Sequence, residues 1–180
     1  MNLEKLKYPI GNRNFDPSSA SIMKNTWIRS IVELPNSLER VVKSVSENDL
    51  LLEYRPDGWS IAQVIHHLAD SHMNAYLRTK FALTENHPNV FGYEESVWAN
   101  LEDARSTDII SSLNLIKGLH ARWAQTFENM EAADFEKKYH HLGYKKDFDL
   151  MNVLSLYAWH SDHHLAHIHQ ALKYQGNFNL

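Results

Sequence analysis

The chain has 180 residues, of which 43% are hydrophobic and 22% charged, and this is enough apolar material for one ordinary globular core. A net charge of −4 from mixed acidic and basic residues argues against nucleic-acid binding. The sequence contains no long uncharged apolar run, so it predicts no membrane span. Cysteine is absent, so any metal must be held by nitrogen or oxygen ligands. The first residues lack the apolar run of a signal peptide, so we expect a cytoplasmic protein.

The N-terminal half predicts an irregular arm followed by two helices. Residues 1–17, with two prolines and one glycine, are expected to form the arm. Helical periodicity begins after residue 18 or 19 and continues to about residue 46, and Pro35 is expected to break this helix or to start a new first turn. Ser60 is a good N-cap for a second helix from residue 61 to about residue 83.

The C-terminal half predicts two more helices with long connections. A connection is expected over 85–105, with a short helical turn near 94–99, and Ser106 or Thr107 can cap a third helix that reaches about residue 127. The polar stretch 131–149 predicts a small hairpin or an ordered loop, and Asp149 can cap a last helix over 150–174. Together these elements predict an all-α fold, a four-helix bundle formed by a single domain over 1–180.

Histidines gather on the predicted last helix, in the stretch WHSDHHLAHIH, which contains five of the twelve in the chain. At about 100° per residue, His160 and His164 fall on the buried face, one turn apart, where their imidazoles can reach one point. We therefore interpret them as metal ligands, and the alternative is a pair of core histidines hydrogen-bonded to backbone carbonyls or to each other. The other histidines of the stretch lie at the edge or on the far side of the helix: His163, His167 and His169.

A third ligand is expected from the second helix, because open catalytic zinc sites usually have three protein ligands. Ser161 stands where the HExxH motif needs a glutamate, so a metalloprotease with that motif is excluded. On the second helix, His72 falls in the apolar stripe, His67 on its flank, and His66 faces away. Helix phase alone does not decide between His67 and His72.

Other polar residues have weaker claims to a role at such a site. Asp70 and Asp162 could orient the second nitrogen of a ligand histidine, although their helix phase argues against it. Glu94 and Glu95 could act as general bases from the long connection. Arg78, in the same sector as His67, could bind an anionic substrate group or pair with a surface carboxylate. The tryptophans are sufficiently explained by packing.

Two stretches, GWSIAQVIHHLADSHMNAYLRTKFALTE and LYAWHSDHHLAHI, resemble the YfiT-like branch of the DinB superfamily, whose members are described as metal-dependent hydrolases. The resemblance extends to KYPIG, YRPDGW, YEESVW and GLHARW, and so covers almost the whole chain. It implies an up-down-down-up four-helix bundle, a homodimer, and one divalent metal per chain. Carried over residue by residue, the ligands it implies are His67, His160 and His164.

Three functions are compatible with such a site. The first choice is a metal-dependent hydrolase that uses zinc, or nickel, with an open position for water, acting on a small-molecule substrate. A near equal is transfer of a low-molecular-weight thiol, because a metal also favours thiolate over thiol. The resemblance implies bacillithiol or glutathione as such a thiol, since better-studied relatives in the wider superfamily transfer thiols of this kind. The third is a metal-binding stress protein without turnover. Histidine must be neutral to bind a metal, so we expect metal to be lost below about pH 6.

Overall fold

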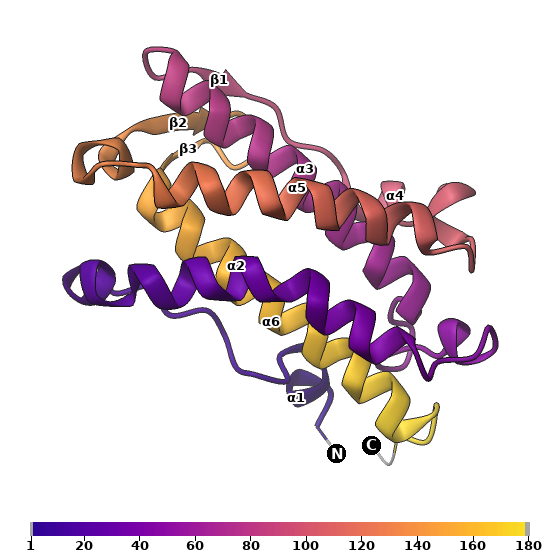
Figure 1. Cartoon of the computed structure of the whole chain (residues 1–180). Helices are drawn as coiled ribbons and strands as arrows, with labels where there is room; N and C mark the ends of the chain where they lie inside the picture. The colour runs from indigo at the N-terminus through magenta and orange to yellow at the C-terminus, as the bar shows by residue number, and fades with distance from the viewer. Residues whose placement is uncertain (1, 179–180) are drawn as a thin grey trace.

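The computed structural model describes residues 2–178, so residues 1, 179 and 180 of the predicted domain lie outside the described residues. Four long helices dominate it (Figure 1). They are α2 (Ala20–Val42), α3 (Ile61–Thr84), α5 (Ile110–Glu128) and α6 (Leu150–Tyr174). The shorter elements are α1 (Leu3–Lys7), α4 (Glu95–Trp98), the 3₁₀ helices η1 (Pro17–Ser19), η2 (Asp49–Leu51), η3 (Asp103–Arg105) and η4 (Ala132–Glu136), and the strands β1 (Asn89–Val90), β2 (Lys138–His141) and β3 (Lys146–Asp149).

The four long helices form a bundle of up-down-down-up topology. Helix α2 packs against α5 and α6, and α3 packs against the same two helices. The colour gradient in Figure 1 shows that α2 and α6 run in one direction and α3 and α5 in the other. The predicted all-α four-helix bundle is therefore confirmed. Among residues 2–178, no helix has both the length and the apolar composition to cross a lipid bilayer.

A small three-stranded sheet lies at the end of the bundle where α6 begins (Figure 1). Strands β2 and β3 pair antiparallel, with Tyr139 opposite Phe148, which confirms the hairpin alternative for this stretch. Strand β1 comes from the long connection after α3 and adds to β2 in parallel. The sheet thereby ties the two long connections together.

The predicted N-caps of α3 and α6 are both confirmed. The Oγ of Ser60 accepts a hydrogen bond from the backbone N–H of Gln63 at 3.2 Å, and the Gln63 Oε1 accepts one from the Ser60 backbone N–H at 3.0 Å. This reciprocal pair satisfies two N–H groups that the first turn leaves without partners. At α6, the Oδ1 of Asp149 accepts from the Asn152 backbone N–H at 2.7 Å. The caps fix where the two histidine-rich helices begin.

The predicted break at Pro35 is wrong. Helix α2 continues through Pro35, which is buried. A proline in a helix has no N–H to donate to the carbonyl four residues earlier, here that of Ile31. That carbonyl instead accepts a hydrogen bond from the Nδ1 of His120 on α5, at 2.6 Å. A side chain of another helix thus replaces the missing donor.

The predicted cap of α5 is also wrong. The backbone N–H of Ile110 donates to Asp108 Oδ1 at 3.3 Å. Thr107 instead donates its hydroxyl to Glu47 at 2.9 Å, and Ser106 Oγ accepts from the Asp108 backbone N–H at 3.0 Å. Ser106, Thr107 and Asp108 are consecutive short polar residues, and each could accept a hydrogen bond from the first backbone N–H groups of α5. The position of the helix start alone does not show which of them does.

The arm that the sequence predicts as irregular contains helix α1. Asn2 caps it by accepting a hydrogen bond from the backbone N–H of Glu4 at 3.0 Å, and its Leu6 side chain is fully buried. The Nε2 of Gln170 on α6 donates to the Leu6 carbonyl at 2.9 Å. The arm is therefore docked against α6.

Buried histidines lie at mid-bundle between two apolar clusters. One cluster surrounds Trp123 and Phe127 toward the sheet, and the other surrounds Leu38 and Ile65 toward the opposite end. The boundary is visible on each helix: His72 lies between Ala69 and Ala75 on α3, His120 between Ile116 and Trp123 on α5, and His160, His163, His164 and His167 between Tyr157 and Ile168 on α6.

Burial at this boundary changes the acid–base behaviour of the histidines. The side chain of His120 is 1% exposed. Desolvation lowers its pKa from 6.5 to about 4, although the hydrogen bond to the Ile31 carbonyl acts in the opposite direction. His120 is therefore neutral in the folded protein at pH 7.

We expect the free energy of unfolding of the metal-free protein to decrease as the pH falls from about 6.5 to about 4. In that window His120 takes up a proton in the unfolded chain but not in the folded one, so the unfolded state binds more protons. At 1.36 kcal/mol per pKa unit, His120 alone accounts for a loss of up to roughly 3 kcal/mol. Urea unfolding of the wild type and His120→Gln at several pH values measures this, and the variant should show the weaker pH dependence. Equal pH dependence in both proteins would contradict the assignment, and His169→Gln, at an exposed position, is the control.

Candidate metal centre

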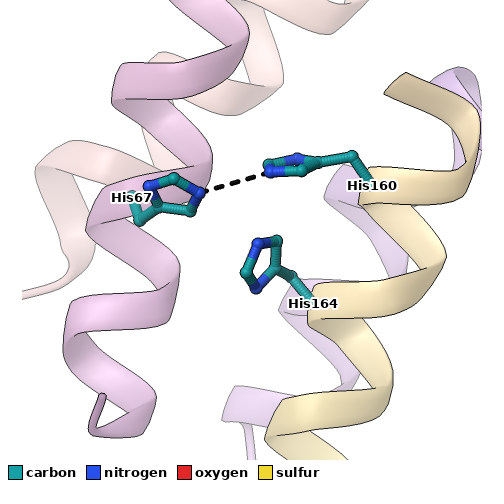
Figure 2. Close-up of side chains that lie close together, drawn as sticks. All are labelled: His67, His160 and His164. Carbon is teal, nitrogen blue, oxygen red and sulfur yellow. Dashed lines mark hydrogen bonds between the residues drawn. The ribbon is translucent and has the colours of Figure 1, made fainter. Parts of the chain in front are cut away.

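Three imidazoles face one another between α3 and α6. His67 comes from the second turn of α3, His160 and His164 come from consecutive turns of α6, and Figure 2 shows their rings in the space between the two helices. The Nε2 atoms of His67 and His160 are 3.2 Å apart. The ring centroid of His164 lies 4.8 Å from that of His67 and 4.4 Å from that of His160. The structure thus brings together His160, His164 and, of the two candidates that helix phase left open, His67, which is the residue that the family resemblance implied.

The spacing of these nitrogens fits a divalent metal ion. Zinc binds imidazole nitrogen at about 2.0–2.1 Å, so two nitrogens on a tetrahedral zinc are about 3.3 Å apart. The 3.2 Å between the Nε2 atoms of His67 and His160 is close to that separation. One nitrogen from each of the three histidines lies within 4.8 Å of the others, and among residues 2–178 no other group of three or more potential ligands converges in this way. The residues present fit a nitrogen-ligated ion.

Access to the cluster is uneven. His67 and His164 are 4% and 7% exposed, whereas His160 is partly exposed. Trp59 packs against two of the rings, with its ring centroid 4.7 Å from that of His67 and 6.4 Å from that of His164. Trp59, which the sequence suggested only as a packing residue, therefore packs on the site itself. Surrounding side chains therefore cover most of the cluster, and His160 is its most exposed member.

Burial keeps the three imidazoles neutral at pH 7. Desolvation, with a further contribution from the nearby His163, lowers the pKa of His67 from 6.5 to about 4. Desolvation, followed by repulsion from neighbouring imidazoles, lowers the pKa of His160 and His164 as well. Their nitrogen lone pairs therefore stay available to a metal at lower pH than an ordinary histidine allows. The sequence alone predicted metal loss below about pH 6, and burial moves this expected loss to more acidic pH.

The outer nitrogens of the two α6 histidines contact other histidines. The Nδ1 of His160 is 2.9 Å from the Nε2 of His72, and the Nδ1 of His164 is 3.4 Å from the Nδ1 of His167. His72 is fully buried and hydrogen-bonded in the core, as its helix phase suggested. His167, predicted at the edge of the buried face, is 2% exposed and lies directly behind His164.

The two aspartates considered for this orienting role lie elsewhere. Asp162 is exposed and accepts a hydrogen bond from the Ser30 hydroxyl at 3.4 Å. Desolvation, with Asp103 nearby, raises the pKa of Asp70. Among the described residues, neither aspartate is hydrogen-bonded to a histidine of the site. Imidazoles occupy the positions where carboxylates are more usual.

His66 does not face away from the core, contrary to the prediction. It is 7% exposed, its Nδ1 lies 2.8 Å from the Ser112 hydroxyl oxygen, and its Nε2 lies 2.9 Å from the Ser106 carbonyl. The reason is that α5 packs on the face of α3 that the apolar stripe leaves free. A helix buried on more than one side has no single inward direction.

The burial of the two remaining α6 histidines agrees with their helix phase for His169 but not for His163. His169 is exposed, as predicted. His163, predicted at the edge, is 7% exposed and stacks on Trp159 with ring centroids 4.3 Å apart. Its Nδ1 is buried without a hydrogen-bond partner among the described residues.

His120 was not recognised from the sequence. It lies in the GLHARW stretch of α5, and its Nε2 is 2.8 Å from the Nδ1 of His72. The available signal was its position between Ile116 and Trp123, on the apolar face of α5. A histidine on such a face needs a buried partner, and the sequence does not show which helix supplies it.

Arg78 on α3 and the two glutamates of the long connection are not hydrogen-bonded to the three imidazoles among the described residues. Arg78 is 8% exposed and donates from Nη2 to the Phe91 carbonyl at 2.7 Å. Desolvation raises the pKa of Glu95, and the charge of Arg78 opposes that shift. Among the described residues, neither Glu94 nor Glu95 is hydrogen-bonded to a histidine of the site. The contacts assign no general base to this connection.

Known proteins resemble this chain over nearly its whole length. A protein of Bacillus licheniformis is 42% identical over 174 residues, covering 97% of this chain and 99% of the relative. YfiT of Bacillus subtilis is 38% identical over 176 residues, covering 98% and 99%. Both carry the name "putative metal-dependent hydrolase".

The fold comparison agrees. The solved structure of YfiT from Bacillus subtilis, described as "a probable metal-dependent hydrolase with an unusual four-helix bundle topology", matches with a TM-score of 0.90 and 38% identity, over 95% of this chain and 98% of that one. The family described as the DinB superfamily matches residues 30–168, a range that contains all three histidines of the site. The chain belongs to the DinB superfamily.

Proposed function

We propose that this protein is a metal-dependent hydrolase whose divalent ion is held by His67, His160 and His164. The observation that carries the proposal is the convergence of three neutral imidazole nitrogens in a group without a carboxylate or a fourth histidine. Structural zinc sites are filled by four protein ligands, whereas catalytic sites keep a position open. The names of the Bacillus relatives support the same class of reaction.

We propose zinc as the ion, with nickel as the alternative, since imidazole nitrogen suits both. When bound, such an ion supplies Lewis acidity, which polarises a carbonyl group and activates water as a nucleophile at neutral pH. The protein contributes the rest. Two consecutive turns of α6 and one turn of α3 hold the ligands, Trp59 packs against two of them, and His160 is the most exposed of the three.

The site should bind about one metal ion per chain, and both α3 and α6 should be needed. We expect His67→Ala and His160→Ala to weaken zinc binding by at least about 100-fold, because removing a ligand should exceed the 10–100-fold loss typical of its outer partners. Elemental mass spectrometry of untagged protein purified without a metal column, followed by zinc titration, measures this.

His169→Ala is the matched control, because His169 is on the same helix but exposed. It should retain the metal content of the wild type. Equal metal loss in all three variants, or a wild type that takes up no added zinc, would contradict the proposed site.

The reaction class can be tested on the zinc-loaded protein with activated esters and amides, assayed with and without a low-molecular-weight thiol. We expect hydrolysis that needs no thiol, is abolished by a chelator, and is lost in His160→Ala but kept in His169→Ala. Product formation only in the presence of thiol, with the thiol joined to the electrophile, would instead establish an S-transferase.

A further inference from the structure

A chain of hydrogen bonds runs from the site across all four long helices. The Nδ1 of His160 on α6 is 2.9 Å from the Nε2 of His72 on α3, and the Nδ1 of His72 is 2.8 Å from the Nε2 of His120 on α5. The Nδ1 of His120 is 2.6 Å from the Ile31 carbonyl on α2. We call this series the long hydrogen-bond chain.

The carbonyl at its end fixes every proton in the long hydrogen-bond chain. A carbonyl can only accept, so the Nδ1 of His120 carries a hydrogen, and a neutral imidazole has only one. The Nε2 of His120 must then accept from the Nδ1–H of His72, and the Nε2 of His72 from the Nδ1–H of His160. The proton of His160 is thereby held on Nδ1. Its Nε2, 3.2 Å from the Nε2 of His67, is then unprotonated and can act only as an acceptor or a ligand.

A shorter series reaches the other α6 ligand. The Nε2 of His167 is 3.1 Å from the Lys7 carbonyl, so this nitrogen carries the hydrogen and the Nδ1 of His167 accepts. The Nδ1 of His164, 3.4 Å away, is then the donor, although this contact is longer than the others. This short hydrogen-bond chain leaves the Nε2 of His164 with a free lone pair, by the same logic as in the long chain.

Pro35 leaves the terminal acceptor of the long hydrogen-bond chain, the Ile31 carbonyl, free to accept from His120. The Ile31 carbonyl has no N–H four residues ahead, because residue 35 is proline. It is therefore free to accept from His120 without competition from its own helix at that position. The short hydrogen-bond chain ends in a similar way, on the carbonyl of the last residue of α1. Both chains end on backbone carbonyls at positions where the helical hydrogen-bond pattern is interrupted.

We propose that His72, His120 and His167 are positioning residues, which fix the proton of His160 and His164 on Nδ1 and so present both Nε2 atoms toward His67. The use of those atoms as ligands rests on the proposed function. The proton positions themselves are a property of the metal-free protein. Imidazole replaces the carboxylate that commonly orients a metal-binding histidine, so the entire arrangement is uncharged.

The proton positions can be measured directly in metal-free wild-type protein labelled with ¹⁵N-histidine. Two-bond ¹⁵N–¹H correlation spectra distinguish the two neutral forms of each ring, and single variants assign the signals. We expect Nδ1–H for His120, His72, His160 and His164, and Nε2–H for His167. A proton on the Nε2 of His160 would overturn the long hydrogen-bond chain, and one on the Nε2 of His164 would overturn the short one.

The positioning role can be measured by competition between the protein and a chelator for zinc. His72→Leu removes the acceptor for His160 and should weaken zinc binding by about 10–100-fold, the usual effect of losing an outer partner. His72→Gln keeps an oxygen acceptor near the position of the ring Nε2 and should recover most of the affinity. Equal losses in the two variants would overturn the role of the acceptor.

His66→Leu is the matched control, since His66 is on the same helix, is buried, and is hydrogen-bonded toward α5 but not to the site. It should bind zinc within about threefold of the wild type, well short of the outer-partner effect. If His66→Leu lost as much zinc affinity as His72→Leu, the loss would be explained by disturbed packing of α3, and the proposal would be overturned. If the wild type itself binds no zinc, the proposed function fails, while the proton positions remain measurable.

Discussion

The packing of neutral imidazoles at the middle of the bundle is the constraint on which the rest of the structure depends. A buried N–H or ring nitrogen without a partner costs about 1–3 kcal/mol, and a buried imidazolium costs more. The protein meets this constraint by pairing imidazoles with one another and ending each series on a backbone carbonyl. The two apolar clusters on either side supply hydrophobic stabilisation that a polar layer cannot supply.

An uncharged surrounding has a chemical consequence for a metal site. Carboxylates that orient ligand histidines also make those histidines more basic and bring negative charge close to the ion. Here the partners of His160 and His164 are neutral imidazoles, and neither Asp70 nor Asp162 is hydrogen-bonded to them among the described residues. The full charge of a divalent ion would therefore be available to stabilise an anionic nucleophile or a developing oxyanion.

Much of the fold and part of the site could be predicted from the sequence, for identifiable reasons. Ser60 and Asp149 are local signals, and they correctly located the starts of α3 and α6. The spacing of His160 and His164 is also local, because residues four apart share a helix face. The choice between His67 and His72 was not local. Phase left it open, the family resemblance favoured His67, and the structure gives both residues a place, His67 facing the other two imidazoles and His72 behind His160.

What the sequence could not show depends on contacts between distant segments. The burial of His66 follows from α5 packing on α3, and the continuity of α2 through Pro35 is accompanied by a donor from α5. No periodicity within one helix contains that information. His120 was missed for the same reason, since its partners are an α3 side chain and an α2 carbonyl.

The docking of α1 against α6 also bears on how the protein is made. The Lys7 carbonyl and the ring of His167 are 160 positions apart in sequence, and His67 and His160 are 93 apart. Contacts of such long range are slow to form, because closing a long loop costs chain entropy before the contact is made. A nascent chain on the ribosome cannot complete this site until α6 has emerged. The ion that it binds would then be selected by the finished protein, from the metals present in the compartment where folding ends.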